Sequence, residues 1–314
     1  MGKYAFLFPG QGSQYVGMGK NLRDNFGIAA DVFEMADDAL KEKLSDLCFQ
    51  GPADDLNLTM NTQPAILAVS VAALRVVQQE SGITPVMVGG HSLGEFSALV
   101  AAGVLQFADA LRLVRKRGTF MQEAVPLGIG GMAAILGMDA AVVERICNER
   151  AQGQIVAPAN YNSPGQVVIS GHVEAVTRVA ETAVTEGAKM TKILPVSAPF
   201  HSVLMEKAAR RFAAVLDPIE LGDMDIPVLS NVTADFYPSK SDVKTLLTEQ
   251  LTHPVRWHEE MDRMLECDID GILELGPGKV LRGIMRRISQ RVPMKHIENC
   301  DTLKIALSGM STGT

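Results

Sequence analysis

The chain has 314 residues, a length that fits one large domain with a smaller subdomain. Hydrophobic residues make up 47% and charged residues 21%, so there is ample apolar material for a core. The net charge of −7 argues against a nucleic-acid partner, because contacts with phosphate groups need a basic surface.

The cysteines, histidines and apolar runs narrow the class of protein further. Four scattered cysteines form no C-x-x-C pair, which favours free thiols in a reducing compartment over a disulfide framework. Six histidines include no H-E-x-x-H motif, so we expect neither a metal site nor a cofactor. No secretory signal is recognisable, and no run approaches about 18 apolar residues. We therefore expect a cytoplasmic protein that does not span a membrane, and a monomer.

The N-terminal segment predicts a buried strand followed by a tight loop. Residues 4–8 are apolar and end in Pro9-Gly10, and apolar runs then alternate with helical stretches to about residue 125, which favours parallel βα units. One such helix is expected from Thr62 to Val77. Gln11 lies between two glycines, so its N–H could approach a ligand closely and serve as an oxyanion donor. A glycine turn needed only for chain reversal explains the same pattern equally well.

The most informative motif is G-x-S-x-G at residues 90–94, between a predicted strand at 85–88 and a predicted helix at 95–104. A serine at a sharp strand-to-helix turn presents its hydroxyl above the sheet, and the next N–H points to where an oxyanion would form. This favours Ser92 as the nucleophile of an acyl transfer and Leu93 as an oxyanion donor. The alternative is a plain glycine turn.

A charged residue lies on the apolar side of the next predicted helix, at residues 107–121. Arg117 falls about 60° from Val114 at the edge of the apolar stripe, whereas its basic neighbours face away. A cation turned inward must be paired or hold an anion, and a guanidinium can bind both oxygens of a carboxylate. From periodicity alone, a structural ion pair is the more frequent explanation.

Residues 127–197 show a different order of elements. Strands at 132–136, 154–159, 166–170 and 192–196 alternate with helices at 140–150 and 173–186, in the order βαββαβ. This order is typical of a ferredoxin-like unit. We therefore predict an α/β fold in which residues 1–126 and 198–314 form a large, hydrolase-like, three-layer domain with a parallel sheet and a nucleophile elbow. Residues 127–197 form an inserted ferredoxin-like subdomain. Further strands of the large domain are expected at 227–230 and 272–275.

His201 is the best candidate for the base that a serine nucleophile needs. It follows the last subdomain strand and Pro199, which restricts the backbone so that the imidazole would be presented from a loop. An ordinary, partly exposed histidine is the competing interpretation. His91, next to Ser92, is expected to point away from it.

The motifs occur together in a recognisable order: Gly10-Gln11-Gly12-Ser13-Gln14, Gly90-His91-Ser92-Leu93-Gly94-Glu95, Arg117, His201 and Glu274-Leu275-Gly276-Pro277-Gly278. From residue 3 to about 300, the chain resembles the malonyl-CoA:acyl carrier protein transacylases of bacterial type II fatty acid synthesis.

The resemblance implies roles for individual residues. Ser92 would be the nucleophile and His201 its base, oriented by the backbone carbonyl of Gln250, with the N–H groups of Gln11 and Leu93 as the oxyanion hole. Arg117 would hold the malonate carboxylate. Phe200 would favour malonyl over methylmalonyl groups, and Asn160 and Asn162 would line the cleft. Met190 stands where relatives often have a basic residue near coenzyme A, and Lys189 and Lys192 are its possible substitutes.

The implied activity is transfer of a malonyl group from malonyl-CoA to the thiol of acyl carrier protein through a malonyl-serine intermediate. Both molecules would be substrates. A serine esterase or thioesterase is an alternative, although no His-Gly-Gly-Gly loop and no C-terminal acid–histidine pair is evident. A non-enzymatic module that binds the carrier protein is a third possibility.

Overall fold

The structure is a computed structural model that describes residues 2–196 and 198–308. The larger body is built on a four-stranded parallel sheet of order β2-β1-β7-β8, formed by β1 (Tyr4–Phe8), β2 (Met87–Gly90), β7 (Gly271–Leu275) and β8 (Met294–Ile297). Its helices are α1 (Lys20–Asn25), α2 (Gly27–Leu40), α3 (Leu44–Gln50), α4 (Ala53–Asn57), α5 (Thr59–Ser81), α6 (Gly94–Ala101), α7 (Phe107–Gln122), α10 (Glu206–Leu216), α11 (Val243–Glu249), α12 (Trp257–Leu265), α13 (Val280–Ile288) and α14 (Cys300–Leu307), with short 3-10 turns η1 (Val203–Met205) and η2 (Lys240–Asp242).

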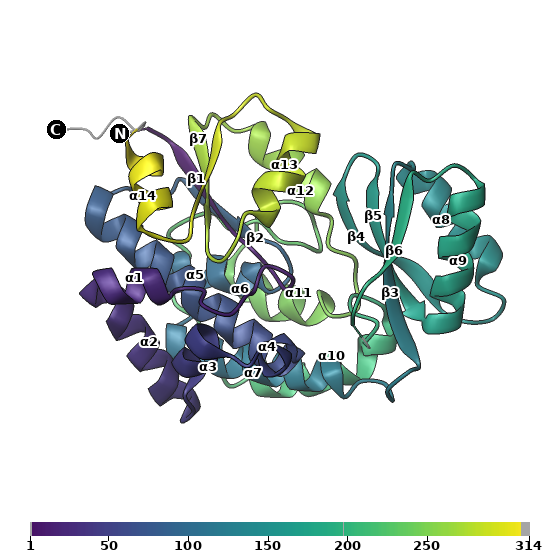
Figure 1. The fold of residues 1–314 in the computed structure, drawn as a ribbon, viewed down its shortest axis with the longest axis horizontal. Coiled ribbons are helices and arrows are strands. Elements are labelled where there is room, and N and C mark those ends of the chain that lie inside the picture. Colours follow the sequence, from purple (N-terminus) through teal and green to yellow (C-terminus); the bar gives the residue numbers. More distant parts are fainter. Residues whose placement is uncertain (1, 197, 309–314) are drawn as a thin grey trace.

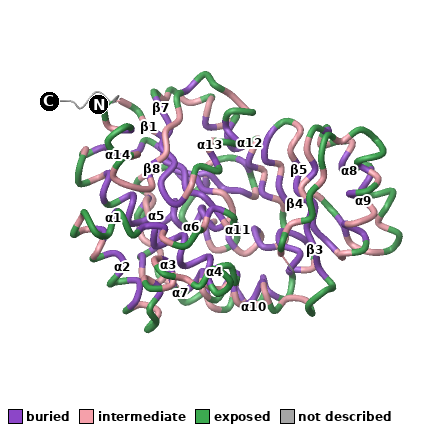
Figure 2. The backbone as a smooth tube through the Cα atoms, in the orientation of Figure 1, coloured by how far each residue is buried: buried purple, intermediate pink, exposed green. Residues whose placement is uncertain are grey.

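Helices cover both faces of this sheet. Successive residues of each strand point to opposite faces, so apolar residues on both faces are buried against helices. In β1, Phe6 and Phe8 pack into the core with α5, α6 and α7, whereas Ala5 and Leu7 pack with α12 and α13. Figure 2 shows the buried residues concentrated in the strands and central helices of this body. The predicted α/β fold with a parallel sheet is confirmed.

Helix α5 runs through the middle of the larger body. It is long and apolar enough to cross a membrane, but 83% of its most apolar window is buried inside the protein, as in the core helix of a folded domain. It starts at Thr59, three residues before the expected start at Thr62, and contains Pro64.

A second lobe lies beside the larger body (Figure 1). Its antiparallel sheet has the order β4-β5-β3-β6, formed by β3 (Gly130–Leu136), β4 (Val156–Ser163), β5 (Gln166–His172) and β6 (Met190–Ile193). Helices α8 (Ala140–Arg150) and α9 (Val173–Thr185) pack on it and share a separate apolar core. The βαββαβ order is the one expected. The proposed boundary at Ser197 lies outside the described residues, and the domain limits stay a prediction.

Main-chain hydrogen bonds join the two lobes. The Tyr161 N–H donates to the Val255 carbonyl, and the Val255 N–H donates to the Ala159 carbonyl, both at 2.9 Å. Asn160 and Val255 thus form a parallel bridge between β4 and the larger body. A strand end held in this way gives side chains of the small lobe a defined position at the junction.

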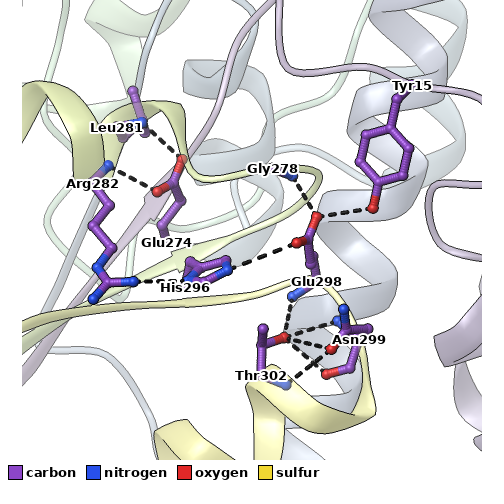
Figure 3. A network of polar contacts seen from close by, with 9 residues as sticks. All are labelled: Tyr15, Glu274, Gly278, Leu281, Arg282, His296, Glu298, Asn299 and Thr302. Carbon is purple, nitrogen blue, oxygen red and sulfur yellow. Dashed lines mark hydrogen bonds and ion pairs between the residues drawn. The ribbon is translucent and has the colours of Figure 1, made fainter.

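A polar network holds the loops beyond the carboxyl ends of β7 and β8 (Figure 3). The buried Glu274 carboxylate accepts the N–H groups of Leu281 and Arg282, both at 2.9 Å, at the start of α13. Glu298 accepts from the Gly278 N–H at 2.8 Å and from the Tyr15 hydroxyl at 2.9 Å. Because Tyr15 follows the Gln11 loop, this network connects that loop, which comes after β1, to the loops after the neighbouring strand β7 and the edge strand β8.

Several expected strands differ from those observed, among them β4, at 156–163 instead of 154–159, and β6, at 190–193 instead of 192–196. Strand β2 covers residues 87–90 instead of 85–88, since it pairs with β1 up to Phe8 opposite Gly90. The strand expected at 227–230 is reduced to single bridges, from Val228 to Val88 and from Leu229 to Phe236. The chain turns back at residue 230, where the Ser230 N–H bonds to the Asp235 carbonyl, so the pairing with β2 stops.

We expect Gly94→Ala to destabilise the protein by about 3 kcal/mol or more, because the added methyl would overpack a site closed by backbone. A Cβ there would lie 2.0 Å from the Phe8 carbonyl oxygen. The matched control is Gly283→Ala in α13, where nothing lies within 4 Å. Alanine should stabilise that exposed helix position by about 0.5–1 kcal/mol. Urea unfolding measures both, and equal effects would contradict the packing argument.

Candidate active site

Ser92 lies in a strained turn between β2 and α6. Its φ is +51°, in the left-handed region that a residue with a side chain rarely adopts. The flanking glycines are required by close contacts, since a Cβ on Gly90 would lie 2.0 Å from the Gly94 carbonyl group. The turn therefore has the geometry of the nucleophile elbow inferred from the sequence.

Ser92 and His201 are in direct contact. The Ser92 hydroxyl lies 2.7 Å from His201 Nε2, and His201 Nδ1 lies 2.7 Å from the Gln250 carbonyl oxygen. Because a carbonyl only accepts, Nδ1 carries the proton and Nε2 is free to accept one from Ser92. Both ring nitrogens are thus engaged without a carboxylate.

Burial keeps the imidazole neutral. Burial, assisted by the nearby positive charge of Arg117, lowers the pKa of His201 to about 3. A histidine with this pKa is an unprotonated acceptor throughout the neutral range.

Arg117 is buried beside the serine. Its guanidinium donates to the Gln63 side-chain oxygen at 2.9 Å, the Gln250 side-chain oxygen at 2.7 Å and the Ser92 hydroxyl at 3.2 Å. It also lies over the Phe96 ring at 5.4 Å. Burial lowers the pKa of Arg117 to about 10, so it stays charged at neutral pH. Among the described residues no carboxylate forms an ion pair with it, and its Nε has no hydrogen-bond partner.

These groups surround a cavity of about 120 Å³ at the junction of the lobes. Its lining combines polar side chains around Ser92 with an apolar wall; it comprises Gln11, Gln63, His91, Ser92, Leu93, Arg117, Met121, Met132, Asn160, Leu194, Val196, Phe200 and His201. Met132 and Asn160 come from the small lobe, and Ser92 and Arg117 come from the large one.

The cavity has free main-chain donors beside Ser92. Over residues 2–196 and 198–308, the N–H groups of Gln11 and Leu93 donate to no protein acceptor, although both residues line the cavity. The Gln11 side chain is tied back to Thr59 at 3.2 Å. Free N–H groups next to a nucleophile are suited to an oxyanion.

The remaining candidates lie at the same site. Phe200 and Asn160 line the cavity, whereas the Asn162 side-chain oxygen contacts His91 Nε2 at 2.8 Å. Asn162 therefore does not line the cavity itself but contacts His91, which does. In the described part of the chain, no group of three or more His, Cys, Asp or Glu side chains is placed to hold a metal.

The sequence analysis missed several polar residues of the site. Gln63 contacts Arg117 directly. Asn231, Tyr237 and Glu260 form a buried network beneath the elbow together with Glu95, which the motif included without a role. Burial raises the pKa of Glu95 to about 7, and it raises that of Glu260 well above its usual value. For Gln63, the only sequence signal was its place in the second position of the helix expected from Thr62 to Val77, which says nothing about its contact with Arg117.

Comparisons with known proteins agree with this geometry. Residues 5–305 match the acyl transferase domain family. The malonyl CoA-acyl carrier protein transacylase of Bacillus subtilis strain 168 is 48% identical over 308 residues, covering 98% of this chain and 97% of the relative. The Escherichia coli K12 protein of the same name is 46% identical, covering 98% and 99%.

A solved structure of a malonyl-transacylase in complex with a type II PKS acyl-carrier protein has a TM-score of 0.96 and 45% identity, covering 98% of this chain and 100% of that one. A strained serine contacting a neutral histidine, a buried arginine beside it and similarity along nearly the whole chain lead to one conclusion. The chain belongs to the acyl transferase family, among the malonyl CoA-acyl carrier protein transacylases.

Proposed function

We propose that this protein transfers the malonyl group of malonyl-CoA to the phosphopantetheine thiol of acyl carrier protein, supplying fatty acid synthesis. The observation that carries the proposal is the buried Arg117 guanidinium, which pairs with no carboxylate of the described residues and lies 3.2 Å from the hydroxyl of a serine in contact with a neutral histidine. A site of this kind accepts an acyl group that ends in a carboxylate.

In the first half of the reaction, His201 Nε2 takes the Ser92 proton as the hydroxyl oxygen attacks the thioester carbon. The tetrahedral intermediate collapses by breaking the carbon–sulfur bond. The coenzyme A thiol leaves with the proton from His201, and malonyl-Ser92 remains. In the second half, His201 removes the proton of the carrier-protein thiol, which attacks the ester, and returns it to Ser92.

The proposed oxyanion hole consists of the Gln11 and Leu93 N–H groups. Both line the cavity beside Ser92 and lack a protein acceptor in the described structure, so neither must break a bond to receive the oxyanion. Donors that need no rearrangement stabilise a transition state most effectively.

Arg117 and the apolar wall would select the acyl group. Malonate would pair with the guanidinium, whereas an acetyl group would leave a buried charge unpaired. Phe200 lines the cavity, and we propose that it limits space for an α-methyl substituent. Asn160 would contact the acyl chain, and Asn162 would hold His91. The coenzyme A path near Met190, the monomeric state and the cytoplasmic location stay predictions.

Intact-protein mass spectrometry after brief incubation with malonyl-CoA tests the reaction. We expect a malonyl adduct on the wild type and none on Ser92→Ala, with rapid loss of the adduct only when holo acyl carrier protein is added. Loss at the same rate without the carrier protein would identify a thioesterase. If neither an adduct nor free coenzyme A is formed, the remaining interpretation is a non-enzymatic module that binds the carrier protein.

Replacing Arg117 tests selection of the carboxylate. Loss of a charged hydrogen-bonding partner costs about 1.5–3 kcal/mol, so we expect Arg117→Ala to lower kcat/KM for malonyl-CoA by about 10- to 100-fold. Acetyl transfer should rise relative to malonyl transfer. Lys116→Ala is the control, because it removes one positive charge from the exposed side of the same helix. An unchanged malonyl preference in Arg117→Ala would refute the role.

The protonation of His201 is a separate test. With a pKa of about 3, the imidazole should stay neutral from pH 8 to pH 5, so its nitrogen NMR shifts should not change across about pH 6.5, the ordinary histidine value. The unfolded chain takes up this proton near pH 6.5 and the folded chain does not. His201 therefore makes stability fall as pH decreases from about 6.5 towards 3. Imidazolium signals from His201 at pH 6 would contradict this prediction.

A further inference from the structure

The main chain of the nucleophile elbow is held by the side chain of a residue from another segment. Strand β2 pairs with the segment that follows residue 226: the Val88 N–H donates to the Pro227 carbonyl, and the Leu229 N–H donates to the Val88 carbonyl, both at 2.9 Å. This pairing ends at Ser230. Asn231 then replaces it with its side-chain amide, which donates to the Gly90 carbonyl at 2.8 Å and accepts the Ser92 N–H at 2.7 Å.

The partners define the orientation of this amide. The Gly90 carbonyl can only accept and the Ser92 N–H can only donate, so the Asn231 nitrogen and oxygen cannot exchange places without losing both bonds. Asn231 is fully buried, and its amide nitrogen also donates to Glu260 at 2.9 Å. Its own N–H donates to Glu95, and its carbonyl accepts from the Arg256 N–H.

Asn231 and Gln250 together hold both main-chain groups of Ser92. The Ser92 carbonyl accepts from the Gln250 side-chain nitrogen at 3.0 Å, while its N–H is held by Asn231. Gln250 in turn contacts His201 through its main chain and Arg117 through its side chain. The positive φ of Ser92 is unfavourable for a residue with a side chain, so it persists only where surrounding contacts impose it.

We propose that Asn231 is a positioning residue for the reaction: its amide keeps Ser92 in the strained conformation in which the hydroxyl meets His201 and the Leu93 N–H faces the cavity. It touches neither the substrate nor the hydroxyl, so it acts through the main chain of Ser92. The inference depends on the proposed function only for the identity of the acyl donor, malonyl-CoA. That Ser92 is the nucleophile follows from the geometry of the site.

Glu260 supports Asn231 from the opposite side. One carboxyl oxygen accepts from the Asn231 amide, and the other is buried without a partner among the described residues. The raised pKa of Glu260, caused first by burial, favours the neutral acid, which accepts this hydrogen bond without a second buried charge beside Glu95. Removing Glu260 would therefore loosen Asn231 without touching the elbow.

The test compares Asn231→Leu, which keeps the side-chain size and removes the two hydrogen bonds to the elbow as well as the one to Glu260, with Glu260→Leu. We expect the single-turnover rate of Ser92 malonylation to fall about 10- to 100-fold in Asn231→Leu, as for a misplaced reacting group, and by less in Glu260→Leu. The dissociation constant for malonyl-CoA, measured in a Ser92→Ala background, should stay within about twofold because no substrate contact is lost.

A stability control separates positioning from general destabilisation. Asp139 caps α8 of the small lobe by accepting the Ala141 N–H at 3.0 Å and belongs neither to the cavity lining nor to the network around the elbow, so Asp139→Ala should lower Tm and leave the malonylation rate unchanged. The proposal is overturned if folded Asn231→Leu malonylates at the wild-type rate, or if its rate and its affinity for malonyl-CoA fall by the same factor.

A fluorophosphonate reagent, which labels activated serines whatever their natural substrate, separates this proposal from the proposed function. We expect rapid labelling of Ser92 in the wild type and slow labelling in Asn231→Leu, even if malonyl-CoA were the wrong donor. If Asn231→Leu does not fold, the labelling rate of Glu260→Leu is the test. Slower labelling of Ser92 than in the wild type supports the proposal, and an equal rate overturns it.

Discussion

The left-handed conformation of Ser92 is the constraint on which the site depends. With φ at +51°, the hydroxyl lies 2.7 Å from His201 Nε2, above the carboxyl edge of the parallel sheet, where α/β proteins commonly bind ligands. The glycines at 90 and 94 are needed because any side chain there would collide with main chain. The tight contact between β1, β2 and α6 thus follows from the requirement to present one hydroxyl.

A second constraint is the burial of the Arg117 charge, which forms no ion pair with residues 2–196 or 198–308. Removing a guanidinium from water is unfavourable unless neutral partners compensate, and Gln63, Gln250 and the Phe96 ring supply that compensation. Glu95, the buried acid whose charge acts on Arg117, is engaged instead by Tyr237 and Gln250. The guanidinium therefore remains available for an anion that arrives in the cavity.

The parts of the site that could be predicted are those encoded locally. The elbow was recognisable because Gly90, Ser92 and Gly94 are close in sequence between a strand and a helix, and the inward position of Arg117 followed from helical periodicity. His201 lies 109 residues from Ser92 and was named as the candidate base from its place after the last subdomain strand. Gln250 lies 158 residues from Ser92, and its role was inferred only from resemblance. Asn231 and Gln63 were missed because a neutral amide has no spacing signal; only the folded chain reveals what it contacts.

The absence of a carboxylate behind His201, within the described residues, follows from the same electrostatics. Gln250 contacts His201 through its carbonyl and Arg117 through its side chain, both at 2.7 Å. An aspartate or glutamate in this place would be close enough to pair with Arg117 and neutralise the charge proposed to bind the substrate. It would also raise the pKa of His201, opposing the burial that keeps the base neutral. A neutral residue at position 250 orients the base and leaves the cation free, which a serine–histidine–acid triad in this pocket could not do.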